Sequence, residues 1–171
     1  MGFIDVNGTF GEGGDDVDFF PVFYNLVHAV GENCPNVRDD VKMVQYLLFH
    51  IYKSISPVFT PKGNLTIDGV CGGITKNWIL KFQLDIRSTG NSILADKRVD
   101  RMRDKNGMSG KISDTYYTMA YLNWYAAGFA KEAYLKLPQV VPVQNAANVP
   151  PPSNDIVVPP PPPLVCAVGG L

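Results

Sequence analysis

The most informative segment of the chain is Asp68-Gly69-Val70-Cys71-Gly72-Gly73-Ile74-Thr75-Lys76-Asn77-Trp78-Ile79-Leu80-Lys81-Phe82-Gln83. Its opening Asp-Gly pair favours a tight turn, because glycine tolerates a positive φ and aspartate hydrogen-bonds its own backbone. Gly72 and Gly73 are expected to let the chain pass closely under the next helix. Thr75 falls in the first helical turn, where its hydroxyl can meet a free amide. The inward-facing residues of this helix, predicted over 74–84, are Ile74, Trp78, Ile79, Phe82 and Leu84.

A second amphipathic helix is predicted upstream, over residues 39–52. Its apolar face consists of Val41, Val44, Leu48 and Ile51, flanked by Met43, Leu47 and Tyr52. Asp39 and Asp40 fall in its first turn, where negative charge suits the helix dipole. Gln45 and Gln83 stand next to core positions on the two helices. Each carboxamide can bond loop backbone and so hold the turn in place.

Taken together, the two segments resemble the signature of the peptidoglycan-binding-like domains, which are small helical cell-wall-binding modules. That family has V-x-x-L-Q-x-x-L on one helix, then D-G-x-F-G-x-x-T and F-Q. The matching positions are Val41, Gln45, Leu48, Asp68, Gly69, Gly72, Thr75, Ile79, Phe82 and Gln83. Val44 replaces a leucine, Cys71 an aromatic residue and Trp78 a small residue. The resemblance implies an all-α fold with a small three-helix bundle over residues 37–110. A short helix over 96–104, burying Val99 and Met102, occupies the place of the family's second turn and helix.

The segments outside this domain differ in composition. Proline removes the amide donor and fixes φ, so a proline-rich segment is expected to be extended. The expected segments are a flexible Gly-rich arm over 1–16, an N-terminal helix (17–30) with its connector over 17–36, a long aromatic-rich helix (114–136) within 111–137, and a Pro-rich extended tail over 138–171. The long helix is apolar on several faces, which fits either a buried core helix or a helix that also docks a partner.

The resemblance implies a shallow ligand groove beside the Asp68 turn, with contacts from Asp68, Thr75, Asn77 and Trp78. Trp78 has two interpretations. Its ring either fills the core, next to the position where Cys71 replaces an aromatic residue, or lies exposed and stacks on a sugar face. The first interpretation is the simpler one, and the second would make Trp78 a ligand contact.

No constellation for catalysis is evident. His28 and His50 fit no metal-ligand pattern such as HExxH, and neither a G-x-S-x-G elbow nor a P-loop occurs. Cys71 lies near a helix start, where a thiolate is stabilised, but no partner base is evident. We therefore expect a non-catalytic protein without a cofactor or a metal ion.

Composition narrows the classes of partner. Hydrophobic residues make up 46% of the 171 residues, charged residues 18%, and the net charge is -1. This balance indicates a packed globular domain with no general attraction for nucleic acid or anionic membranes. Three cysteines do not make a disulfide framework. No run is long enough to span a membrane, and the first residues lack the features of a secretory signal, so synthesis in the cytoplasm is expected.

Two functions follow as expectations. The first is a non-catalytic peptidoglycan-binding or tethering module. The alternative is a structural or assembly protein of a phage particle or a secretion or injection machine, incorporated into that assembly and reusing the fold for protein docking. Protein partners are expected through the 114–136 helix and through the Pro-rich tail.

Overall fold

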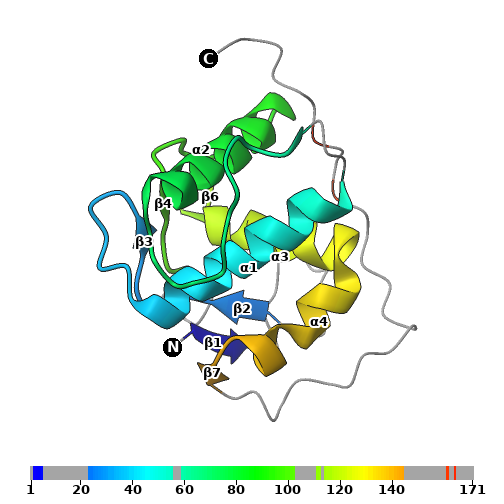
Figure 1. Cartoon of the computed structure of the whole chain (residues 1–171). Helices are drawn as coiled ribbons and strands as arrows, with labels where there is room; N and C mark the ends of the chain where they lie inside the picture. Colours follow the sequence, from blue (N-terminus) through cyan, green and yellow to red (C-terminus); the bar gives the residue numbers. More distant parts are fainter. Residues whose placement is uncertain are drawn as a thin grey trace.

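Four helices are the main elements of the part of the chain that the structure describes (Figure 1). The computed structural model describes residues 2–5, 23–55, 59–102, 111–112 and 114–144, together with residues 161 and 164. The helices are α1 (Arg38–Ser54), α2 (Gly73–Ser88), α3 (Thr118–Phe129) and α4 (Lys131–Val140). In Figure 1, α1 crosses the middle of the view with α2 on one side and α4 on the other. The chain is therefore mostly helical, as predicted.

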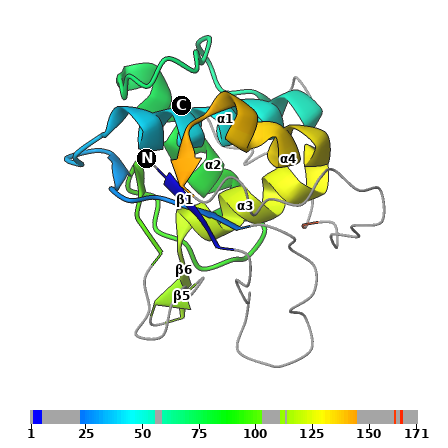
Figure 2. The same cartoon turned by 90° about the horizontal axis from the view of Figure 1, so that it is seen from below.

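The described residues also form short strands, so the fold is not purely all-α. They are β1 (Gly2–Asp5), β2 (Phe23–Asn25), β3 (Val30–Gly31), β4 (Arg98–Val99), β5 (Lys111–Ile112), β6 (Thr115–Tyr116) and β7 (Val143–Gln144). In one sheet, β1 pairs antiparallel with β2 and parallel with β7, and Figure 2 shows β1 close to β7. The pairs β3–β4 and β5–β6 form two further ladders. The first strand thus lies between β2 and β7, the strand that follows α4.

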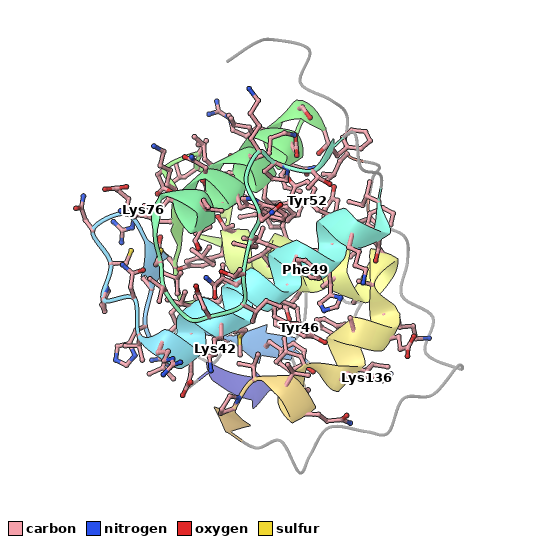
Figure 3. All side chains as sticks on the ribbon, in the orientation of Figure 1. Lys42, Tyr46, Phe49, Tyr52, Lys76 and Lys136 are labelled. Carbon is pink, nitrogen blue, oxygen red and sulfur yellow. The ribbon has the colours of Figure 1, made fainter. Side chains whose placement is uncertain are left out.

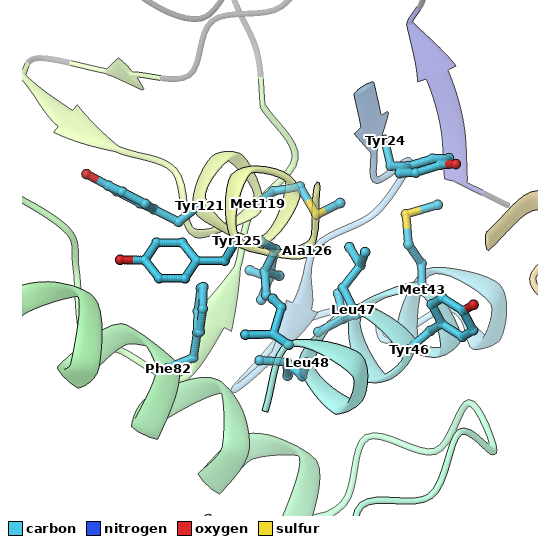
Figure 4. Close-up of a cluster of buried hydrophobic side chains, with 14 of the residues drawn as sticks. Tyr24, Met43, Tyr46, Leu47, Leu48, Phe82, Met119, Tyr121, Tyr125 and Ala126 are labelled. Carbon is cyan, nitrogen blue, oxygen red and sulfur yellow. The ribbon is translucent and has the colours of Figure 1, made fainter. Parts of the chain in front are cut away.

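One hydrophobic core runs through the described residues, from Phe23 to Leu164. Helix α1 packs against α3 and also contacts α2 and α4. Figure 4 shows side chains of these helices meeting in the core, with Leu48 from α1, Phe82 from α2 and Tyr125 from α3. Phe82 and Tyr125 meet edge to face, with ring centroids 5.7 Å apart. All the apolar positions predicted for the 39–52 helix are buried.

The predicted N-terminal helix over 17–30 is wrong for the part of it that the structure describes, residues 23–30. Residues 23–25 form β2, and the side chain of Asn123 on α3 bonds the backbone of Tyr24. The Tyr24 N–H donates to Asn123 Oδ1 at 2.8 Å, and Asn123 Nδ2 donates to the Tyr24 carbonyl at 2.8 Å. Tertiary hydrogen bonds therefore override the helical spacing of the apolar residues. The flexible arm predicted for 1–16 is also wrong at residues 2–5, which form β1; residues 6–22 lie outside the described residues.

No helix forms over the described part of 96–104. The chain turns at Lys97, whose φ of 63° is incompatible with an α-helix, and then enters β4. Gln83 Oε1 accepts the backbone N–H groups of Asp96 and Lys97 at 3.1 and 3.0 Å, so a side chain holds this turn. Val99 and Met102 are nevertheless buried, as predicted.

The long helix predicted over 114–136 is two helices. They are separated at Ala130, whose φ of −130° and ψ of 41° leave the helical region. Nor does the extended tail begin at Pro138, which lies inside α4. Proline has no N–H to donate to the carbonyl of Tyr134 one turn earlier. That carbonyl instead accepts the Tyr24 hydroxyl at 2.9 Å, which allows the helix to continue.

Candidate functional site

The turn before α2 is built around the buried side chain of Gln45. Its Nε2 lies 3.0 Å from Asp68 Oδ1, 3.1 Å from the Val70 carbonyl and 3.1 Å from Thr75 Oγ1. Its Oε1 accepts the Gly69 N–H at 2.8 Å. One carboxamide on α1 thus joins the turn and the first turn of α2, as expected for this glutamine.

Gly69 is required at the turn for two reasons. Its φ is 79°, a region that side chains rarely adopt. A β-carbon at this position would also lie 2.5 Å from Cγ and 2.8 Å from the carbonyl oxygen of Arg38. In contrast, Gly72 and Gly73 have open space where a β-carbon would be, so the predicted close passage under the helix is wrong.

Asp68 is exposed, and its carboxylate is held by the turn itself. The Val70 N–H donates to Oδ1 at 2.8 Å, and the Thr66 hydroxyl donates to Oδ2 at 3.0 Å. These bonds, the Val70 amide first and then the Gln45 and Thr66 side chains, hold the pKa of Asp68 below its ordinary value. The carboxylate is therefore charged and oriented by the protein.

Of the four predicted ligand residues, Asp68 and Asn77 are exposed, whereas Thr75 and Trp78 are buried. Thr75 is buried and donates to the Val70 carbonyl at 3.2 Å, a carbonyl and not the amide expected. Trp78 is 4% exposed; its Nε1 donates to the Gly63 carbonyl at 3.1 Å, and its ring meets Tyr52 edge to face. Of the two interpretations of Trp78, the core one agrees with this position. Asn77 is exposed on the first turns of α2.

The apolar character of the surface around the start of α2 was not predicted from the sequence. Among the described residues, Val70, Ile74, Leu94 and Val140 are the large hydrophobic side chains that are exposed. Two of them, Val70 and Ile74, flank the start of α2; Ile74 was expected to face inward. A β-carbon at Gly63 would lie 3.4 Å from Ile74 Cγ1, so the preceding loop runs beside it. We call Val70, Ile74 and Asn77 the signature face.

A pocket of about 510 Å³ lies elsewhere, between α1 and the start of α4. Its lining combines aromatic rings with a basic rim: Tyr46, His50, Lys53, Ser54, Phe129, Ala130, Lys131, Glu132, Ala133 and Lys136. Figure 3 shows Tyr46 on α1 and Lys136 on α4. Burial, and then the nearby Lys53 charge, lower the pKa of His50. Lys136 pairs with Glu132 at 2.5 Å. No sequence motif indicated this pocket, because its residues come from α1, the end of α3 and α4.

The cysteines of the described chain do not resemble nucleophiles. Cys34 and Cys71 are free and half-buried, and burial raises the pKa of both thiols. An activated cysteine has the opposite shift. Within the described ranges, no three histidine, cysteine or acidic side chains gather as a metal-ligand set. None of the helices described has both the length and the apolar character to cross a membrane.

Comparison of the chain with protein-family models, with curated proteins and with solved structures found no match.

Proposed function

We propose that the protein is a non-catalytic module that binds or tethers to peptidoglycan, and that α1, α2 and α3 form a peptidoglycan-binding-like three-helix bundle. The observation that supports this proposal is the Gln45 network. It uses four residues of the resembling signature, Gln45, Asp68, Gly69 and Thr75, in one set of hydrogen bonds. These signature residues are thus joined by hydrogen bonds to one side chain, which a chance match to the family pattern would not require.

The contact surface we propose is the signature face. A glycan with a peptide stem presents both apolar ring faces and polar amides, and this surface offers Val70 and Ile74 beside the carboxamide of Asn77. Thr75 and Trp78 act beneath it, as supports of the turn and of the helix. The proposed contact set therefore keeps Asn77 and adds Val70 and Ile74, whereas the exposed Asp68 carboxylate is already bonded within the turn.

Cosedimentation with purified peptidoglycan sacculi tests this function. The wild-type protein is expected to sediment with sacculi, and the surface variants Ile74→Asp and Asn77→Ala to remain in the supernatant with an unchanged circular dichroism spectrum. Leu94→Asp is the matched control, because Leu94 is an exposed apolar residue outside the signature face. Sedimentation of all variants alike would refute the proposed surface, and absence of wild-type sedimentation would refute the function.

The alternative is a structural or assembly protein that docks another protein. The α1–α4 pocket favours this function, since its lining combines aromatic rings with three lysines and one glutamate, which suits an acidic, partly apolar peptide segment. Charge reversal at Lys53 separates the two functions. It is expected to weaken protein docking in the pocket and to leave binding to sacculi unchanged.

A further inference from the structure

Part of the proline-rich tail packs on α3. Pro161 is buried, and Leu164 is 5% exposed and belongs to the hydrophobic core. A β-carbon at Gly128 would lie 2.3 Å from Cδ and 3.0 Å from Cγ of Pro161. The proline ring therefore lies directly against the backbone of α3, where any larger residue at position 128 would hold it away.

The backbone of α3 gives no other reason for a glycine at this position. Gly128 lies within the helix, and it is not among the described glycines with a positive φ. Glycine is the poorest helix former after proline. Close approach of Pro161 is thus the structural role of this glycine, as at other sites where a second chain segment approaches a backbone.

The spacing of the two docked tail residues matches one conformation. A polyproline II helix has three residues per turn, so positions 161 and 164 fall on the same side of it. Both are buried, and the two residues between them in the sequence are also prolines. Prolines have φ preset for this conformation, so a proline-rich segment loses little entropy when it docks.

Surfaces that bind polyproline II segments are lined by aromatic rings, and one aromatic residue of α3 lies on the same side of the helix as Gly128. Trp124 lies one helical turn before Gly128, so the two residues share a side of α3, and the Trp124 side chain is half-buried. Trp124 stacks on Tyr121, with ring centroids 6.0 Å apart and planes inclined by 23°. The aromatic-rich helix and the proline tail are the two segments for which the sequence predicted partners, and Pro161 of the tail lies against Gly128 of that helix.

We propose that the face of α3 around Gly128 is a recognition site for a polyproline II segment, and that its occupant is the proline-rich segment of the same molecule that carries Pro161 and Leu164. The site is independent of the proposed wall binding. The tail then acts as an intramolecular ligand, and a proline-rich peptide of the same pattern binds the site when the tail is released.

A labelled peptide of residues 157–165, Val-Val-Pro-Pro-Pro-Pro-Pro-Leu-Val, tests the site by fluorescence anisotropy with full-length protein. In the wild type the attached tail competes at high effective concentration, so the peptide is expected to bind about tenfold or more weakly than to the Leu164→Asp chain. Adding Gly128→Ala to that chain is expected to abolish binding. Gly72→Ala is the matched control, because a methyl group there meets open space. Equal binding to the wild type and to Leu164→Asp, or binding that survives Gly128→Ala, would overturn the proposal.

The wild-type protein provides a test that needs no variant. Nuclear Overhauser contacts between the Pro161 δ protons and the Gly128 α protons are expected, and their absence would overturn the proposal. An equal mixture of isotope-labelled and unlabelled protein identifies the occupant. Contacts within labelled molecules alone support the same-molecule tail, whereas contacts between labelled and unlabelled molecules would overturn that assignment in favour of the tail of a second copy.

Discussion

Gln45 and Gln83 hold two different turns with the same hydrogen bonds. Each Nε2 faces an aspartate Oδ1, the backbone carbonyl two residues after that aspartate, and a threonine hydroxyl of the next helix. Each Oε1 accepts the N–H of the residue that follows the aspartate. The partners of Gln45 are Asp68, Gly69, Val70 and Thr75; those of Gln83 are Asp96, Lys97, Arg98 and Thr118. The α1–α2 and α2–α3 connections are therefore two versions of one structural unit.

Loss of either carboxamide is expected to be costly. Gln45→Ala and Gln83→Ala each leave several buried or half-buried groups without their partner, so each is expected to lower the free energy of unfolding by about 2–3 kcal/mol. Urea unfolding followed by circular dichroism measures this. Asn77→Ala, which removes an exposed carboxamide, serves as control and is expected to change stability by less than about 0.5 kcal/mol. A similar small effect at Gln45 would contradict the structural role given to it.

The repeated unit predicts opposite effects at its two positive-φ residues. Gly69 has φ 79° and Lys97 has φ 63° at equivalent positions. Gly69→Ala introduces strain and a contact with Arg38, so it is expected to destabilise by about 2 kcal/mol or more.

Lys97→Gly removes the strain of a side chain in the left-handed region, which outweighs the greater entropy of an unfolded glycine, so it is expected to stabilise by about 0.5 kcal/mol. Thermal unfolding of both variants at one pH decides this. A Lys97→Gly protein that is less stable than the wild type would show that its lysine side chain contributes more than its backbone costs.

Acid is expected to weaken the Asp68 turn. Because the pKa of Asp68 is depressed in the folded state, chiefly by the Val70 amide, its contribution to stability is present above the ordinary aspartate pKa of about 4 and is lost as pH falls through the folded pKa. Asp68→Asn removes this titration, so the difference in unfolding free energy between wild type and variant is expected to shrink below about pH 4. Urea midpoints measured from neutral pH to about pH 2 test this, and a constant difference would refute it.

The helices around the signature could be predicted from sequence because their apolar residues face one common core. In α1, Val41, Val44, Leu48 and Ile51 are all buried, as their spacing predicted. The helical pattern failed at Ile74 because this side chain lies on the exposed side of the first turn of α2, whereas the adjacent Thr75 is buried. It failed at Phe23 because the partners that make this segment a strand come from β1 and α3, far away in the chain.

The repeated unit had a sequence signal that motif matching alone did not use. Three helices carry a buried carboxamide in the same pattern, with apolar residues four and one positions before it and three positions after it. The three sets are Val41, Val44, Gln45 and Leu48 on α1, Ile79, Phe82, Gln83 and Ile86 on α2, and Met119, Leu122, Asn123 and Ala126 on α3. All twelve are buried. Aligning the helices on their carboxamides would have identified α3 in place of a helix over 96–104. The docking of Pro161 on Gly128 had no comparable signal, because a glycine in a helix indicates a close approach but not which segment approaches.

That approach predicts a change of sign in the effect of one substitution. With the tail detached by Leu164→Asp, Gly128→Ala is expected to stabilise the protein by about 0.5–1 kcal/mol, since alanine is the better helix former. With the tail in place, the added methyl group collides with Pro161, whose ring cannot swing aside as a flexible side chain does, so the same substitution is expected to be neutral or destabilising. The four proteins of this double-mutant cycle, compared by urea unfolding, are expected to show a coupling of about 1 kcal/mol. Equal stabilisation in both backgrounds would mean that the tail does not rest on Gly128.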